Sequence, residues 1–388
     1  MTSRRDLPPA PVSGGWHEGQ PAAFRRFADL GPLRLENGST LPSVRLAYET
    51  WGTLAKDGGN AVLIEHALTG DAHVTGPAAP GQSTPGWWCD IVGPGKIIDT
   101  DQYFVVAANV LGGCQGSTGP SSLGPDGRAW GSRFPIVSTR DQVEAEVRLA
   151  DLLGINAWSL VIGASLGGHR AIEWAVAHPH RVERLIVVAS GAQTTAEQAA
   201  WAHTQIRAIE IDPAWHGGDY YDQGVGPISG FSLARQIAHT TYRSPEELDT
   251  RFGRLPQHEE DPLHGGRLAV QSYLDHHGDK IVRRFDAGSY VTISRSMISF
   301  DVGRDRGGVR EALRGVTART LVVAVDSDRL FFPEQVAQIA HGVGGAFYRE
   351  IHSDHGHDGF LIESDQLSAL FDEFLHERIP ARSSHLLG

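Results

Sequence analysis

A strand, a tight turn and a helix follow one another in residues 160–179, and this stretch constrains the fold more than any other. An apolar run ends at Gly163, the pattern Gly-x-Ser-x-Gly surrounds Ser165, and an apolar helical pattern follows Gly168. In a nucleophile elbow, small flanking residues let the serine adopt a strained backbone at the end of a strand. Two glycines and a serine also make ordinary turns, but the strand before and the helix after favour the elbow. We therefore expect Ser165 Oγ to be an exposed nucleophile, with the Leu166 amide donating to an oxyanion.

The composition argues against several classes of protein. At 388 residues the chain is long enough for one large α/β domain with an insertion, or for two domains. A net charge of −12 without a Lys/Arg-rich block argues against a nucleic-acid partner. Cys89 and Cys114 are too few for a disulfide framework or a zinc site. No stretch approaches the roughly 20 apolar residues of a membrane span, and residues 1–15 lack the apolar core of a signal peptide. We expect a cytoplasmic protein with no metal and no membrane partner.

The remaining chain alternates strands with helices and is interrupted once. An Asn-Gly turn between two alternating segments predicts a β-hairpin over residues 32–51. Further strands are predicted at residues 61–64, 103–108, 184–191, 320–326 and 347–351, and helices at residues 139–154, 333–342 and 365–377. Strand patterns disappear after residue 194, where helices are predicted at residues 195–211, 231–242, 244–252 and 268–285.

This order predicts an α/β fold, with a mostly parallel central sheet flanked by helices and an inserted all-helical lid. We assign residues 16–193 and 306–388 to the catalytic domain and residues 194–305 to the lid. A polar, proline-rich tail, residues 1–15, precedes them.

The chain has the residue order of an α/β-hydrolase, in which the serine is followed by an acid after a late strand and then by a histidine. Asp326 and Asp328 follow the strand predicted at residues 320–326. His352, His355 and His357 follow the strand predicted at residues 347–351. Composition does not choose among these residues. The chemistry needs a histidine that takes the serine proton and is oriented by a buried carboxylate.

Three further residues have side chains or positions that suit a functional role. The loop after the strand at residues 61–64 supplies the second oxyanion amide in this fold class, and Leu68 is the candidate donor. His66 precedes the serine by about a hundred positions, which favours a structural role in that loop. Cys114 lies in a glycine-rich segment without an elbow and is also interpreted as structural.

Several longer motifs resemble the homoserine O-acetyltransferase family of the α/β-hydrolase superfamily. They are the elbow with its paired glycines, His-Ala-Leu-Thr-Gly-Asp at 66–71, the glycine-rich segment 109–120, Arg-Arg-Phe-Asp-Ala-Gly-Ser-Tyr at 283–290 and Gly-His-Asp-Gly-Phe-Leu at 356–361. The resemblance implies Ser165 as nucleophile, Asp328 as orienting acid and His357 as base. It also implies transfer of an acetyl group from acetyl-CoA to the hydroxyl of L-homoserine through an acyl-serine, in methionine biosynthesis. Acetyl-CoA is then a co-substrate, and no bound cofactor is expected.

The resemblance also assigns the acceptor site. It places the homoserine carboxylate on Arg235 and Tyr242, which are seven positions apart and so face the same side of a helix. An arginine can hold a carboxylate with two parallel hydrogen bonds. Asp358, directly after the base, is expected to bind the ammonium group. The resemblance further implies a homodimer formed through the lid helices.

The sequence departs from the usual family pattern at a few positions. The common Gly-Gly-Ser-Met elbow is Gly-Ala-Ser-Leu here, and Phe331 stands where a tyrosine is frequent. The missing hydroxyl bears on how the acyl group or the acceptor is positioned. Alternatives on the same scaffold are transfer of succinyl groups, transfer to serine or to another alcohol, and simple ester hydrolysis. A non-catalytic member of the superfamily would typically lack a triad residue, and this chain lacks none.

Overall fold

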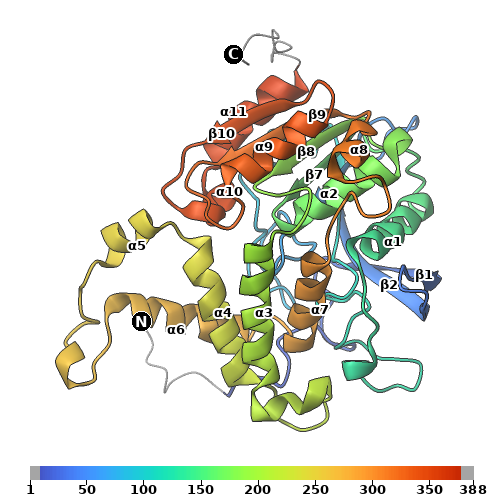
Figure 1. The fold of residues 1–388 in the computed structure, drawn as a ribbon. Helices are drawn as coiled ribbons and strands as arrows, with labels where there is room; N and C mark the ends of the chain where they lie inside the picture. Colours follow the sequence, from blue (N-terminus) through green and yellow to red (C-terminus); the bar gives the residue numbers. More distant parts are fainter. Residues whose placement is uncertain (1–8, 377–388) are drawn as a thin grey trace.

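An eight-stranded, mostly parallel sheet forms the centre of the computed structural model, which describes residues 9–376 (Figure 1). The strand order is β1-β2-β6-β3-β7-β8-β9-β10. β1 (Arg26–Arg34) and β2 (Thr40–Trp51) form the predicted antiparallel hairpin, and β2 joins β6 antiparallel. The parallel strands are β6 (Phe104–Ala108), β3 (Ala61–Glu65), β7 (Leu160–Ala164), β8 (Arg184–Val188), β9 (Arg319–Val325) and β10 (Phe347–Ile351). A separate pair, β4 (Val92–Gly93) and β5 (Ile98–Asp99), lies between β3 and β6 in the chain.

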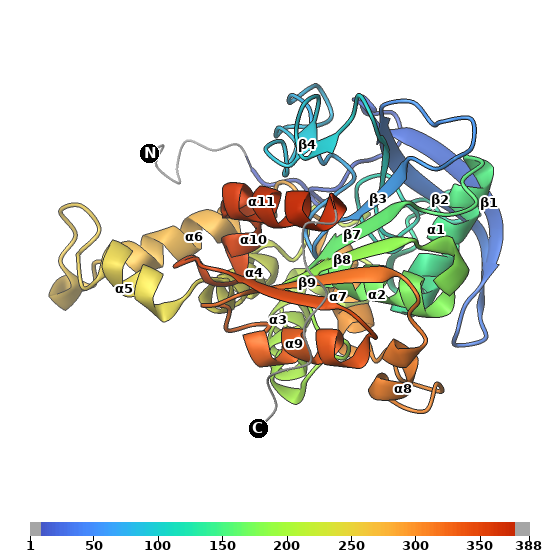
Figure 2. The same ribbon diagram turned by 90° about the horizontal axis from the view of Figure 1, so that it is seen from above.

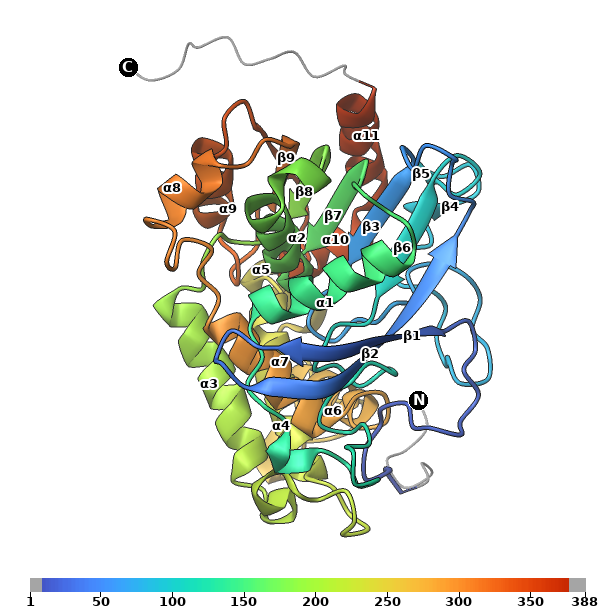
Figure 3. The same cartoon turned by 90° about the vertical axis from the view of Figure 1, so that its right-hand side faces the viewer.

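Each face of the sheet is covered by helices, because successive side chains of a buried strand point to opposite faces. Val161 belongs to the core with α1 (Thr139–Leu152), α2 (Leu166–Ala177) and α9 (Pro333–Gly342), whereas Ile162 belongs to the core with α11 (Ser364–Leu375). Figure 2 shows α11 on one side of the sheet and α9 on the other. The two short remaining helices are α8 (Val309–Arg314) and α10 (Gly359–Ile362). In Figure 3 the hairpin faces the viewer beside α1, below the parallel strands.

Five of the helices that follow β8 belong to the insertion, which lies below the sheet in Figure 1. They are α3 (Ala196–Glu210), α4 (Ile228–Tyr242), α5 (Pro245–Phe252), α6 (Ala269–Ile281) and α7 (Ala287–Ile298). The helix predicted at residues 268–285 was too long. It ends at Ile281, and a new helix begins after Asp286, whose carboxylate accepts from the Ser289 amide as an N-cap. The prediction had missed α7.

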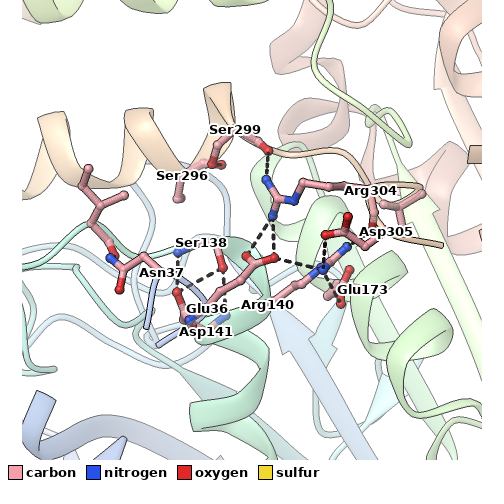
Figure 4. Close-up of polar contacts among 12 residues, drawn as sticks. Glu36, Asn37, Ser138, Arg140, Asp141, Glu173, Ser296, Ser299, Arg304 and Asp305 are labelled. Carbon is pink, nitrogen blue, oxygen red and sulfur yellow. Dashed lines mark hydrogen bonds and ion pairs between the residues drawn. The ribbon is translucent and has the colours of Figure 1, made fainter. Parts of the chain in front are cut away.

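The two connections between sheet and insertion run side by side. The Thr194 amide donates to the Phe300 carbonyl, and the Val302 amide donates to the Ala192 carbonyl. A few residues after the second connection, Arg304 pairs with Glu36 at 2.8 Å. Arg140 of α1 pairs with the same carboxylate at 2.9 Å (Figure 4). Ion pairs thus attach the end of the insertion to the hairpin and to α1.

Part of the predicted N-terminal tail is packed against the protein. The Gly14 amide donates to the Phe285 carbonyl, and the Trp16 amide donates to the Cys114 carbonyl. Residues 1–8 of the tail and residues 377–388 of the predicted catalytic domain lie outside the described residues. Within residues 9–376, no helix is long and apolar enough to cross a membrane.

Candidate active site

Ser165 sits between β7 and α2 in a strained backbone conformation. Its φ of 55° and ψ of −126° lie in a region that residues with a side chain rarely adopt. The turn is sterically possible only because its neighbours lack a Cβ. A Cβ at Gly163 would overlap the Gly167 carbonyl, and a Cβ at Gly167 would overlap the Glu65 carbonyl. The Ser165 amide donates to the Val188 carbonyl at 3.0 Å, so neighbouring β8 helps to hold the elbow.

Three side chains form one continuous series of hydrogen bonds at this elbow. Ser165 Oγ lies 2.8 Å from His357 Nε2, and His357 Nδ1 lies 2.7 Å from Asp328 Oδ2. The other carboxylate oxygen of Asp328 accepts from the amides of Leu330 and Phe331, at 2.8 and 2.9 Å. This series assigns the tautomer with a proton on Nδ1, which leaves Nε2 free to accept the serine proton.

The surroundings favour His357 as a base. Burial lowers the pKa of His357, but the charge of Asp328 and its hydrogen bond outweigh burial, so the pKa lies above the ordinary histidine value. The imidazole is enclosed by aromatic rings. Phe331 stacks on it at 5.4 Å, Phe360 meets it edge-on, and Tyr242 of α4 lies 5.8 Å away. The helical insertion therefore forms part of the wall around the base.

The competing candidates lie elsewhere. Asp326 pairs with His352, whose side chain is 81% exposed, and His355 lies 3.3 Å from Glu247. His66 is buried, donates through Nδ1 to the Ala67 carbonyl and accepts from the Val110 amide. Burial lowers its pKa to about 3, so it is neutral and structural. Burial raises the pKa of the Cys114 thiol well above its ordinary value, which makes it a poor nucleophile.

The two expected oxyanion donors, Leu68 and Leu166, belong to the same buried apolar cluster. Leu166 is the first residue of α2, where an amide has no carbonyl partner within its own helix. Leu68 is buried in the loop that follows β3. That their amides stabilise a developing negative charge on the substrate stays a prediction.

Sequence reasoning missed a buried ionic cluster beneath these donors. Arg170 of α2 is fully buried and lies 2.6 Å from both Glu65 and Glu146. Its other nitrogen, Nη2, donates to the His66 carbonyl at 2.9 Å. Burial raises the pKa of Glu65 well above its ordinary value. The only signal in the sequence was Glu65 at the end of the otherwise apolar β3.

Arg235, the first predicted acceptor residue, lines a cavity of about 340 Å³ between the 67–71 loop, α4 and α6, and Tyr242 is not among the lining residues. Arg235 lies over the Tyr242 ring at 5.3 Å and donates to Thr69 Oγ1 at 3.4 Å. Asp358 also lines this cavity. It has a partner that the sequence did not indicate, because Arg243 Nη2 lies 3.2 Å from its Oδ2.

A larger cavity of about 700 Å³ lies between the N-terminal segment, the hairpin and residues 116–125. None of its lining residues belongs to the series at Ser165. Its one cationic side chain, Arg45, is already paired with Glu18 and Asp29. Within residues 9–376, no group of three or more His, Cys, Asp or Glu side chains is placed to hold a metal ion.

The fold and the site together define a serine-dependent protein of the α/β-hydrolase superfamily. The family model described as alpha/beta hydrolase fold matches residues 60–363. Homoserine O-acetyltransferase of Thermobifida fusca is 58% identical over 376 residues, covering 96% of this chain and 99% of that protein. The chain therefore belongs to the homoserine O-acetyltransferase family, whose members are acyltransferases, as the sequence motifs predicted.

Solved structures include both transferases and esterases. The crystal structure of homoserine O-acetyltransferase from Bacillus anthracis superposes with a TM-score of 0.84 at 27% identity, covering 92% of this chain and 98% of that one. An esterase superposes with a TM-score of 0.83 at 26% identity, covering 90% of this chain and 99% of that one. The predicted fold class is confirmed, and the fold is one on which both acyl transfer and hydrolysis occur.

Proposed function

We propose that the protein transfers an acetyl group from acetyl-CoA to the hydroxyl of L-homoserine, through an acetyl-Ser165 intermediate, in methionine biosynthesis. The observation that carries this proposal is the 58% identity with the Thermobifida fusca homoserine O-acetyltransferase over 96% of the chain. That identity extends over the helical insertion as well as the sheet, and the insertion supplies part of the wall of the cavity in which an acceptor would bind.

In the first half-reaction, His357 Nε2 takes the proton of Ser165 as Oγ attacks the thioester carbonyl. The amides of Leu68 and Leu166 stabilise the oxyanion, and Asp328 stabilises the imidazolium. Collapse of this intermediate breaks the carbon–sulfur bond. The CoA sulfur leaves with the proton held by His357, and Ser165 remains acetylated.

In the second half-reaction, homoserine replaces CoA. His357 Nε2 takes the proton of its hydroxyl, the oxygen attacks the acetyl carbonyl, and Ser165 Oγ leaves with that proton. Arg235 and Tyr242 hold the acceptor carboxylate, which places the hydroxyl toward the acyl group. Asp358 binds the ammonium group and shares its carboxylate with Arg243.

Hydrolysis of the acyl-enzyme is the competing reaction, and the esterase with the same fold makes it the second candidate. The burial of the site favours transfer. Ser165 is 6% exposed and His357 is 3% exposed, and Tyr242 of α4 closes one side of the imidazole. Limited access of bulk water lets a bound alcohol compete for the acyl group.

We also propose that the protein is a cytoplasmic homodimer formed through its insertion. Leu233 of α4, Leu255 and Leu263 are 46%, 63% and 92% exposed, and such apolar side chains on a protruding element favour association. The dimer predicts about twice the monomer mass of 41.9 kDa in light scattering. Replacing Leu233 and Leu263 by aspartate should give the monomer, whereas the same change at Leu123 of the catalytic domain should not.

The decisive experiment measures thiol release by the purified protein with acetyl-CoA or succinyl-CoA, each with homoserine, with serine or without an acceptor. The proposal requires rapid steady-state release only with acetyl-CoA and homoserine. Release with succinyl-CoA or serine would change the substrate and keep the mechanism. Equally rapid release without an acceptor would identify a hydrolase.

A further inference from the structure

The cavity that contains Arg235 carries more positive charge than one amino-acid acceptor needs. Four cationic side chains line it, Arg235, Arg243, Lys280 and Arg284, against the two carboxylates of Asp71 and Asp358. The chain as a whole has a net charge of −12, so an excess of cations in one cavity is a local feature. Cavities lined by one sign of charge favour ligands of the other sign.

Most of these charges have an assigned partner. Arg243 pairs with Asp358 at 3.2 Å and with Glu247 at 3.1 Å. Arg284 interacts through space with Asp71. Arg235 is the residue proposed above for the acceptor carboxylate. Lys280 remains, since within residues 9–376 no carboxylate lies within 4.0 Å of its ammonium group.

Lys280 is more exposed to solvent than two of the arginines that line the same cavity. It is exposed near the end of α6, whereas Arg235 and Arg284 are partly buried. Arg235 contacts Tyr242, which in turn contacts His357. The inner end of the cavity is therefore the acceptor end, and Lys280 lies at the mouth.

Two histidines that line the same cavity have pKa values lowered partly by the nearby cations. His239 of α4 and His277 of α6 lie with ring centroids 3.8 Å apart. Burial, followed by the charges of Arg235, His276, Arg243 and Lys280, lowers the pKa of His277 to about 3. Burial is also the largest cause that lowers the pKa of His239, and Arg235, Arg243 and Lys280 contribute to it as well. Both imidazoles are neutral at pH 7, mainly because they are buried, and the nearby cations act in the same direction.

We propose that Lys280 binds the phosphate groups of the CoA donor at the mouth of this cavity. The inference rests on the proposed function and extends it to the nucleotide end of the donor. A lysine ammonium is a point charge that suits phosphate oxygens without requiring a planar geometry. The mouth position lets the pantetheine arm run inward past Arg235 toward Ser165. The acetyl group and the phosphates are then held at opposite ends of one cavity.

The test compares donors with and without the nucleotide. Steady-state kinetics are measured with acetyl-CoA and with acetyl-pantetheine, which carries the same thioester but no phosphate. Lys280→Gln should raise the KM for acetyl-CoA about tenfold, the usual effect of losing one charge-assisted hydrogen bond. It should change kcat/KM for acetyl-pantetheine by less than about twofold, and Lys280→Arg should restore most of the loss. Lys56→Gln is the matched control, because Lys56 is also exposed but lies in a distant loop.

Each other outcome overturns the inference. Equal losses with both thioesters would give Lys280 a structural role, and a raised KM for homoserine alone would place the acceptor carboxylate there. An unchanged KM for acetyl-CoA would show that the phosphates bind elsewhere. Calorimetric titration with CoA and with pantetheine separates this inference from the proposed function. If the wild-type protein did not acetylate homoserine, weaker binding of CoA alone by Lys280→Gln would still support the phosphate site.

Discussion

The guanidinium of Arg243, at the end of helix α4, lies 3.2 Å from the carboxylate of Asp358, the residue directly after the proposed base His357. An acceptor ammonium must therefore share Asp358 with a cation that is already present. Burial raises the pKa of Asp358, and the nearby charges of Arg243 and His357 oppose this shift. Ammonium binding and the position of α4 are thus linked through one carboxylate.

Asp358→Asn should raise the KM for homoserine about tenfold, because a charge-assisted contact is lost, while the first release of CoA stays near the wild-type rate. Steady-state kinetics give the KM for homoserine, and stopped-flow thiol detection gives the rate of the first CoA release. Arg243→Gln is the informative companion. If Asp358 only held Arg243 in place, the two single variants and the double variant would all lose the same free energy of homoserine binding. Independent losses would support direct binding of the ammonium.

Arg235→Ala should raise the KM for homoserine or slow the transfer step, while the acylation burst with acetyl-CoA remains. The reason is that the guanidinium lies beside Tyr242, and the proposal gives it no contact with the reacting thioester. Arg235→Lys keeps the charge but loses the paired hydrogen bonds, and should give an intermediate KM. A burst reduced as much as turnover would show that Arg235 does not serve the acceptor.

Ser165→Ala should abolish CoA release, because the acyl-enzyme is an obligatory intermediate in the proposed mechanism. Intact-protein mass spectrometry after mixing with acetyl-CoA alone should detect one acetyl group on the wild type and none on this variant. The exposed Ser43 offers a control, and Ser43→Ala should acetylate normally. Turnover of Ser165→Ala near the wild-type rate would contradict a double displacement.

The pH dependence follows from the raised pKa of His357. Only the neutral imidazole can take the serine proton, so kcat/KM should fall as pH drops through a value above the ordinary histidine pKa of about 6.5. Asp328→Asn removes the charge that raises this pKa. It should shift the acidic limb to lower pH and reduce kcat by about 10³ to 10⁴. An acidic limb that stays in place in Asp328→Asn would assign it to another group.

Removing Arg170 should cost stability. Arg170→Met leaves Glu65 and Glu146 buried without their shared cation. Such a loss typically lowers the free energy of unfolding by about 3 to 5 kcal/mol. Urea denaturation measures the change. Arg181→Met breaks a pair with Asp151, whose side chain is 62% exposed, and should cost less than about 1 kcal/mol. Similar losses in the two variants would mean that the buried cluster contributes little.

Local patterns were enough to predict the elements that place the nucleophile. The elbow combines an apolar strand, small residues at required positions and a helix, and all three are properties of neighbouring residues. The order of strands around the insertion followed from the same periodicity. Helix α7 was not predicted, because its start depends on the N-cap Asp286. This residue lies in a stretch whose helical pattern looks continuous with that of α6.

Other features depend on distant segments and had no local signal. Asp326 and Asp328 differ by two positions in one loop, and only the folded chain turns the second toward His357. The pairing of Arg243 with Asp358 joins the insertion to the loop after β10, across more than a hundred residues. The cluster of Arg170 with Glu65 and Glu146 brings together two helices and a strand. Tertiary contacts decide such arrangements, and spacing along the chain does not reveal them.

The close approach of Gly167 to the Glu65 carbonyl bears on how substrate range could change in this protein. With no room for a methyl group between the elbow and β3, the nucleophile and the strand that leads to Leu68 form one unit of fixed dimensions. A longer acyl chain cannot be accommodated by separating them without breaking the turn. Variation in chain length, whether by evolution or by directed mutagenesis, has to come from Tyr242, Arg235 and the rest of the cavity wall that the insertion contributes.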